Sequence, residues 1–145
     1  MPAVPQLSVT NGDSGAVLLS YAVEPGDTFV VGYIHSVNKS LVEDHFVITE
    51  DHRIMVESTS FVAYGAGIPE PEEGQTLTIT EDAVVIDGID RLADPYRLFV
   101  GVIADHRFSM GSGDSIHLKD LVPPQTTLIF QVERQPLWQL LTTKP

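Results

Sequence analysis

The apolar residues of this chain fall into short runs in which apolar and polar positions alternate, and turn-forming residues separate the runs. Residues 28–35 and 41–49 show the pattern most clearly and are rich in Val, Ile, Phe and Tyr. A period of two puts one side of an extended strand in a core, whereas no long stretch has helical spacing. The sequence therefore predicts an all-β fold, a single antiparallel β-sandwich or barrel-like domain, with less than roughly one-fifth helix.

Further strands are expected at 16–22, 54–58, 61–64, 77–80, 83–86, 96–104, 116–118 and 127–133. Turn signals lie at 11–15, 24–27 and Asp87-Gly88, and acidic turns at 50–53 and 80–83 should close two hairpins. Residues 90–98 could form one short helical turn, limited by Pro95. Residues 136–141 suit a short helix or an edge strand.

Length and composition fit one domain over residues 1–145, in which the proline-rich residues 1–6 are expected to be a flexible or engineered start. The formal net charge of -12 argues against binding of nucleic acid or anionic lipid, because both partners need a basic protein surface. The absence of cysteine excludes disulfides, thiolate metal sites and a cysteine nucleophile. No stretch has the roughly 20 apolar residues of a membrane-spanning helix.

The densest group of chemically active residues lies between Tyr33 and His45. A hairpin that pairs His35 with Glu43 and Tyr33 with His45 would place all four side chains on one face. Val30, Gly32, Ile34, Phe46 and Ile48 would then form the core face, with Asp44 near its end. A slip of one residue would exchange the two faces.

Three interpretations of this cluster remain open. His35 and Glu43 could form a hydrogen-bonded cross-strand pair with a structural role. The same face, with Ser36 and Asn38 in the adjoining turn, could bind a ligand, or its imidazoles could coordinate a transition metal. A Ser-His-acid hydrolase is disfavoured because Ser36 and His35 point to opposite sides of a strand and no nucleophile elbow is present. No catalytic residue, resident metal or cofactor is assigned.

A second unusual segment, residues 61–71, contains Gly65 and Gly67 around one alanine, followed by Ile68-Pro69. Two glycines allow close backbone approach, so this loop could bind an anion through its N–H groups or make a tight crossover between sheets. His106 follows an apolar run and could reach the face that carries His35.

These segments together resemble a bacterial domain-of-unknown-function family, the one numbered eighteen-fifty. The resemblance rests on a His-Ser-Val segment beginning at His35, on Glu43, on a Gly-Ala-Gly-Ile-Pro segment beginning at Gly65, and on the late His106. Tyr64 stands where phenylalanine is usual in the family.

The resemblance implies a small β-rich domain that is exported or membrane-anchored, often encoded beside TRAP transporters of the TAXI subtype. It would also explain the proline-rich start, as the result of removing a leader or anchor. The leading hypothesis is an extracytoplasmic accessory domain that contacts TRAP transporter subunits through Tyr33, His35, Ser36, Asn38, Glu43, His45, Gly65, Gly67 and His106. The alternatives are a module that binds a small organic anion or a metal, and an enzyme that uses a histidine with a carboxylate.

Overall fold

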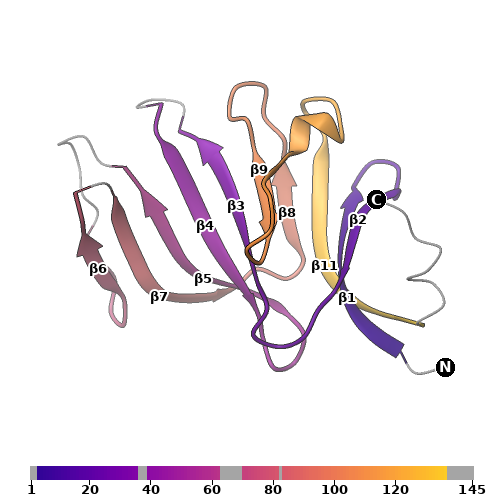
Figure 1. Ribbon diagram of the computed structural model, residues 1–145, viewed down its shortest axis with the longest axis horizontal. Helices are drawn as coiled ribbons and strands as arrows, with labels where there is room; N and C mark the ends of the chain where they lie inside the picture. The colour runs from indigo at the N-terminus through magenta and orange to yellow at the C-terminus, as the bar shows by residue number, and fades with distance from the viewer. Residues whose placement is uncertain (1–2, 36–38, 63–69, 82, 137–145) are drawn as a thin grey trace.

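The computed structural model describes residues 3–35, 39–62, 70–81 and 83–136 (Figure 1). Apart from one short 3-10 helix, η1, every regular element in these ranges is a strand. The elements are β1 Ala3–Asn11, β2 Val17–Ala22, β3 Thr28–Ile34, β4 Leu41–Ile48, β5 Ile54–Phe61, β6 Thr76–Ile79, β7 Val84–Leu92, β8 Tyr96–Phe99, β9 Arg107–Met110, β10 Ile116–His117, η1 Leu118–Asp120 and β11 Thr127–Pro136.

The strands form two antiparallel sheets that face each other without closing into a barrel (Figure 1). The smaller sheet has the order β2-β1-β11-β8, and the larger has the order β10-β9-β3-β4-β5-β7-β6. The predicted all-β class is confirmed, and the architecture is sandwich-like. Strand alternation supplies the apolar inner faces that such a fold needs.

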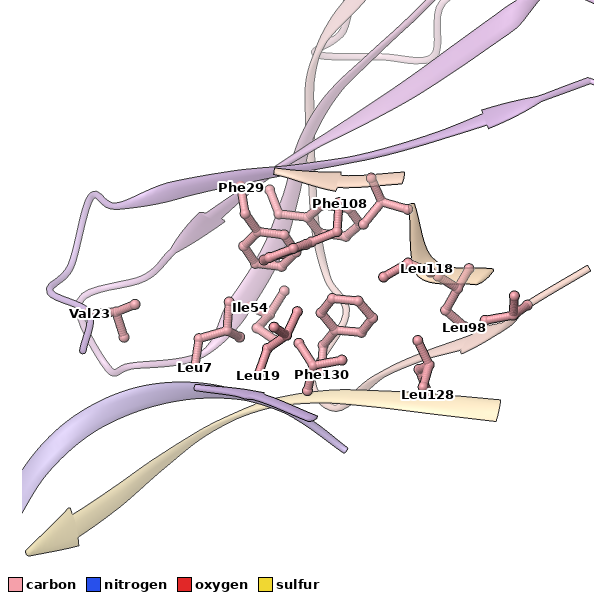
Figure 2. Packing of buried hydrophobic residues seen from close by; sticks show 14 of the residues in the cluster. Leu7, Leu19, Val23, Phe29, Ile54, Leu98, Phe108, Leu118, Leu128 and Phe130 are labelled. Atoms are coloured by element: carbon pink, nitrogen blue, oxygen red, sulfur yellow. The ribbon is translucent and has the colours of Figure 1, made fainter. Parts of the chain in front are cut away.

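The core between the sheets is built around phenylalanine. Phe29, Phe46, Phe108 and Phe130 are fully buried, and the rings of Phe29 and Phe46 stack with centroids 4.7 Å apart. Figure 2 shows Phe29 and Phe108 reaching from the larger sheet toward Phe130 on the smaller one. Burying each such ring stabilises the fold by about 1.5–3 kcal/mol, so this cluster holds the two sheets together.

The N-terminal strand β1 corrects the expectation of a flexible start. Residues 3–6 belong to β1, which pairs with β11 along one edge and with β2 along the other. Leu7 and Val9 are both 0% exposed. The prolines near the start suggested a flexible or engineered segment, yet β1 is a central strand of the smaller sheet.

The segment from β7 to β8 also differs from expectation. Asp87-Gly88 is not a turn, because both residues lie inside β7, where Gly88 adopts a φ of 76°. The short helical turn expected at 90–98 is absent, and β8 ends at Phe99 instead of continuing to residue 104. Tertiary pairing with β5 and β11 overrides these local signals.

Local turn chemistry was a better guide at the two acidic hairpins, which are confirmed. The Thr80 N–H donates to the Ala83 carbonyl at 2.8 Å between β6 and β7. The Thr49 N–H likewise donates to the Arg53 carbonyl at 2.8 Å between β4 and β5.

Candidate functional site

The hairpin of β3 and β4 has a different register from the predicted one. Glu43 lies opposite Gly32, three residues before His35, and Tyr33 lies opposite Val42. The hairpin closes where the His35 N–H donates to the Ser40 carbonyl at 2.8 Å. The predicted pairing of His35 with Glu43 is therefore wrong, because the turn is shorter than that pairing requires.

An odd offset exchanges the faces of one strand relative to its neighbour. Phe46 and Ile48 point into the core as predicted, but on β3 the core side carries Phe29 and Val31. Tyr33 shares this inner face with Asp44.

The opposite, outer face carries Val30, Gly32 and Ile34, which were expected in the core, together with Glu43 and His45. His45 there approaches the hydroxyl of Ser60, with Nε2 and Oγ 3.5 Å apart. The expected Tyr-His-Glu-His face is thus divided between the two sides of the sheet.

The inner face carries a polar cluster that the sequence analysis did not assemble, formed by Tyr33, Asp44, Thr59 and Tyr96. Asp44 lies opposite Thr59 on β5, whose hydroxyl donates to the Asp44 carboxylate at 2.8 Å. Tyr33 is the diagonal neighbour of Asp44 across the β3–β4 pair. Tyr96 reaches over from β8 and packs on Phe46, with ring centroids 4.7 Å apart. A carboxylate and two phenols therefore meet beside the aromatic core.

Burial controls the electrostatics of this cluster. Partial removal from water raises the pKa of the Asp44 carboxyl, and the Thr59 hydrogen bond only partly opposes that rise. Burial, followed by the nearby Asp44 charge, raises the pKa of Tyr33. The same two causes, with Tyr33 as a third, raise the pKa of Tyr96 strongly. Both phenols therefore keep their protons near neutral pH, and Asp44 is the acidic group of the three.

His106 lies beside this cluster and is buried, with its ring 5.7 Å from that of Tyr33. The Gly101 N–H donates to its Nδ1 at 3.4 Å, so the ring proton of the neutral imidazole is on Nε2. Burial lowers the pKa of His106, opposed by the charge of Asp105. This histidine is thus neutral at physiological pH. It lies at the end of the β8–β9 loop and packs against Tyr33.

The β8–β9 loop borders a hollow of about 400 Å³. The hollow is lined by Val100, Gly101, Val102, Ile103, Asp105, His106, Lys119, Asp120 and Pro124. Its size lies within the range of small-molecule sites. It combines apolar side chains with one ammonium group, one imidazole and the two carboxylates of Asp105 and Asp120.

Asp105 organises the basic residues at one side of this hollow. The His117 Nδ1 lies 2.9 Å from its carboxylate, Arg107 Nη2 3.3 Å and Lys119 Nζ 3.8 Å. The His117 hydrogen bond, followed by the charges of Lys119, His117 and Arg107, holds the pKa of Asp105 below its usual range. Asp105 is thus paired with three basic side chains at this side of the hollow.

On the outer face, Gly32 lies between Glu43 on β4 and Arg107 on β9. The missing side chain helps to leave a pit of about 60 Å³, too small for more than a few waters. The Arg107 Nε is buried in the described part of the chain without a hydrogen-bond partner there. Glu43 thus lines this pit and is not paired with His35.

The predicted site residues are only partly brought together. Tyr33 and His106 meet, and His35 lies half-buried at the end of β3, whereas Glu43 and His45 are on the other face. Ser36, Asn38, Gly65 and Gly67 lie outside the described residues. Asp44, an acidic residue in an otherwise apolar alternation, was the available signal for the inner cluster.

The described residues contain no group of three or more His, Cys, Asp or Glu side chains placed to hold a metal ion. Nor do they include a helix that is long and apolar enough to cross a membrane.

The fold and these sites define an all-β, sandwich-like domain with a polar cluster at the margin of its core and a hollow beside one loop. The chain matches the family described as Domain of unknown function (DUF1850) over residues 29–118, and it belongs to that family. The match spans β3 to the start of η1 and includes Asp44, Tyr96 and His106. No curated protein and no solved structure shows significant similarity to the chain.

Proposed function

We propose that this domain is a non-enzymatic, extracytoplasmic accessory domain of a TAXI-type TRAP uptake system and acts by contact with transporter subunits. Membership of the family supports the proposal, through the genetic association that the resemblance implies. The observation that carries it is the exposure of large apolar side chains on and beside the β8–β9 loop. Phe99 is 56% exposed, Val102 71% and Ile103 69%.

The backbone of this loop is anchored while its apolar side chains project outward. The Ala104 carbonyl accepts a hydrogen bond from the Ile34 N–H at 2.7 Å, and Gly101 is hydrogen-bonded to His106. A fixed loop loses little conformational entropy when a partner covers it, and exposed apolar groups that lie together are typical of protein-contact surfaces.

Capture from membranes tests this function. The tagged domain should retain TAXI-type transporter subunits from membranes of the source bacterium, and the double variant Val102→Ser with Ile103→Ser should retain at least tenfold less. Ile79→Ser with Leu92→Ser is the matched control, because these side chains are 59% and 52% exposed on other strands. Both double variants should melt close to the wild type, since exposed side chains contribute little to packing. Equal capture by the two double variants would refute the loop as the contact, and no capture by the wild type would refute the function.

The hollow beside the same loop favours a second candidate, a module that binds a small organic anion. Lys119 and the Nε2–H of His106 supply donors for a carboxylate, and Val102 and Ile103 supply an apolar side. Asp105 and Asp120 also line the hollow, so an anion would bind there only through the donors of Lys119 and His106. Short-chain carboxylates should raise the Tm of the wild type and not of Lys119→Gln, because a ligand of the folded state stabilises it. Arg97→Gln, at an exposed position on β8, is the control. The enzyme hypothesis loses the His35–Glu43 pair that motivated it.

A further inference from the structure

We propose that Asp44, Tyr33 and Tyr96 form a binding site for one organic cation, the alkylammonium or guanidinium group of a free amine or of a basic side chain. The site lies on the inner face of β4, opposite β8, which is the edge strand of the smaller sheet. It is therefore at the margin of the interface between the sheets, and all three side chains keep part of their surface exposed.

The first argument is the position of Asp44. Its neighbours along the inner face of β4, Phe46 and Ile48, are 1% exposed. An apolar side chain would continue this pattern, whereas a carboxylate withdrawn from water costs free energy unless it is paired. Local rules of folding are most often broken at functional positions, because selection for binding outweighs the loss of stability there.

The second argument is that Asp44 has no ion-pair partner in contact with it in the described part of the chain, although the charge of His45 next to it on β4 acts on it. Every ion pair recorded among the described residues involves Asp94 or Asp105, and none involves Asp44. The one hydrogen bond to its side chain comes from Thr59 and engages Oδ1, which leaves the second carboxylate oxygen to other donors in this part of the chain. A ligand with N–H donors and a positive charge would supply both missing interactions.

The third argument is the aromatic surroundings. Tyr33 and Tyr96 both lie close enough to Asp44 for its charge to act on their hydroxyls. The faces of tyrosine rings attract ammonium and guanidinium groups, and more strongly where water is partly excluded. Calcium or magnesium would need several oxygen ligands, whereas a single carboxylate with two phenol side chains nearby suits an organic cation. An anion would be repelled by Asp44.

Titration of the purified domain with n-butylammonium and n-butylguanidinium, at constant ionic strength, tests the site. Butyrate and n-butanol serve as anionic and neutral controls of the same length. Both cations should raise Tm in a saturable manner. At tenfold excess over Kd the folding equilibrium shifts about elevenfold, or about 1.4 kcal/mol, and Tm rises by about 3–6 °C.

Asp44→Asn should abolish this rise, and Asp87→Asn, at an exposed position on β7, should leave it unchanged. Tyr96→Leu removes the ring face and should weaken the rise, which tests the site through a second residue if Asp44→Asn fails to fold. An absent response in the wild type, an equal response to butanol, or an undiminished response of folded Asp44→Asn would overturn the proposal.

A second arm separates the two sources of the cation, with a lysine residue blocked at both ends and its side-chain-acetylated twin as probes. Binding of the blocked lysine, and not of its twin, would support a basic side chain of a partner. Binding of butylammonium alone would support a free amine. Because this test uses the isolated domain, its result is independent of transporter capture.

Discussion

Replacing Asp44 by asparagine should stabilise the domain near neutral pH, even though it weakens a hydrogen bond. Taking a carboxylate partly out of water costs several kcal/mol, and the hydrogen bond from Thr59 returns about 1.5–3 kcal/mol. The Thr59 hydroxyl also has a second acceptor, the Glu43 carbonyl at 3.3 Å, so the variant leaves it satisfied. Asparagine keeps the size of the side chain and removes its charge. The net gain should be about 1 kcal/mol at pH 7.5.

The pH dependence of that gain identifies its origin. Burial raises the pKa of Asp44 above its unfolded value of 3.8, so the folded state binds this proton more tightly than the unfolded chain does. The contribution of Asp44 to stability is therefore greatest below pH 3.8 and is lost as pH rises through the folded pKa.

Urea unfolding of both proteins between pH 4 and 7.5 measures this effect. The advantage of Asp44→Asn should grow with pH and then level off. Contributions from His106 and other groups cancel in the difference, provided that their own pKa values are unchanged. A variant that is less stable than the wild type by the same amount at every pH would refute the reasoning.

The remaining predictions concern other parts of the fold. Gly88→Ala should destabilise by more than 2 kcal/mol, because a Cβ there would lie 2.6 Å from the Gly74 carbonyl oxygen at a left-handed φ. Gly15→Ala, with a similar φ and open space around it, should lose about 1 kcal/mol, and equal losses in urea unfolding would contradict the clash. Phe130→Ala should cost about 3–5 kcal/mol by the same assay, since the ring is fully buried among other rings. His106→Gln should reduce the loss of stability as pH falls below 6.5, because burial lowers the pKa of His106 in the folded state. If the variant and the wild type lose stability equally as pH falls, His106 does not contribute to that loss.

The fold class follows from the sequence because alternation and turn chemistry are local. Local sequence is sufficient to predict β3, β4 and the turn between β6 and β7, and the structure confirms all three. β1 and β9 were not predicted: prolines obscured the alternation at the start of β1, and β9 has only four residues. Each of them also pairs with a strand far away in the chain, which a local pattern does not show. The segment around Gly88 shows the same limit, because a local turn signal was overridden by the long pairing of β7 with β5.

The candidate site depended on one choice of register. On β4 the large residues Phe46 and Ile48 identified the inner face correctly. On β3 both faces carry apolar side chains, so alternation alone did not choose between Val30 and Val31. The deciding information is the turn, which closes with the bond from His35 to Ser40 and makes the hairpin shorter than expected.

The same three-residue offset that separates His35 from Glu43 also produces the inner cluster. With the closing bond at Ser40, Tyr33 and Asp44 share the inner face, and the phenol of β3 becomes the diagonal neighbour of the carboxylate on β4. A longer turn would have placed Tyr33 on the face of His45 and left Asp44 beside aliphatic side chains. The length of one hairpin turn thus decides whether this domain presents a histidine pair or a carboxylate flanked by aromatic rings. An insertion of one residue after His35 should therefore remove the cation response even if every side chain of the site is retained.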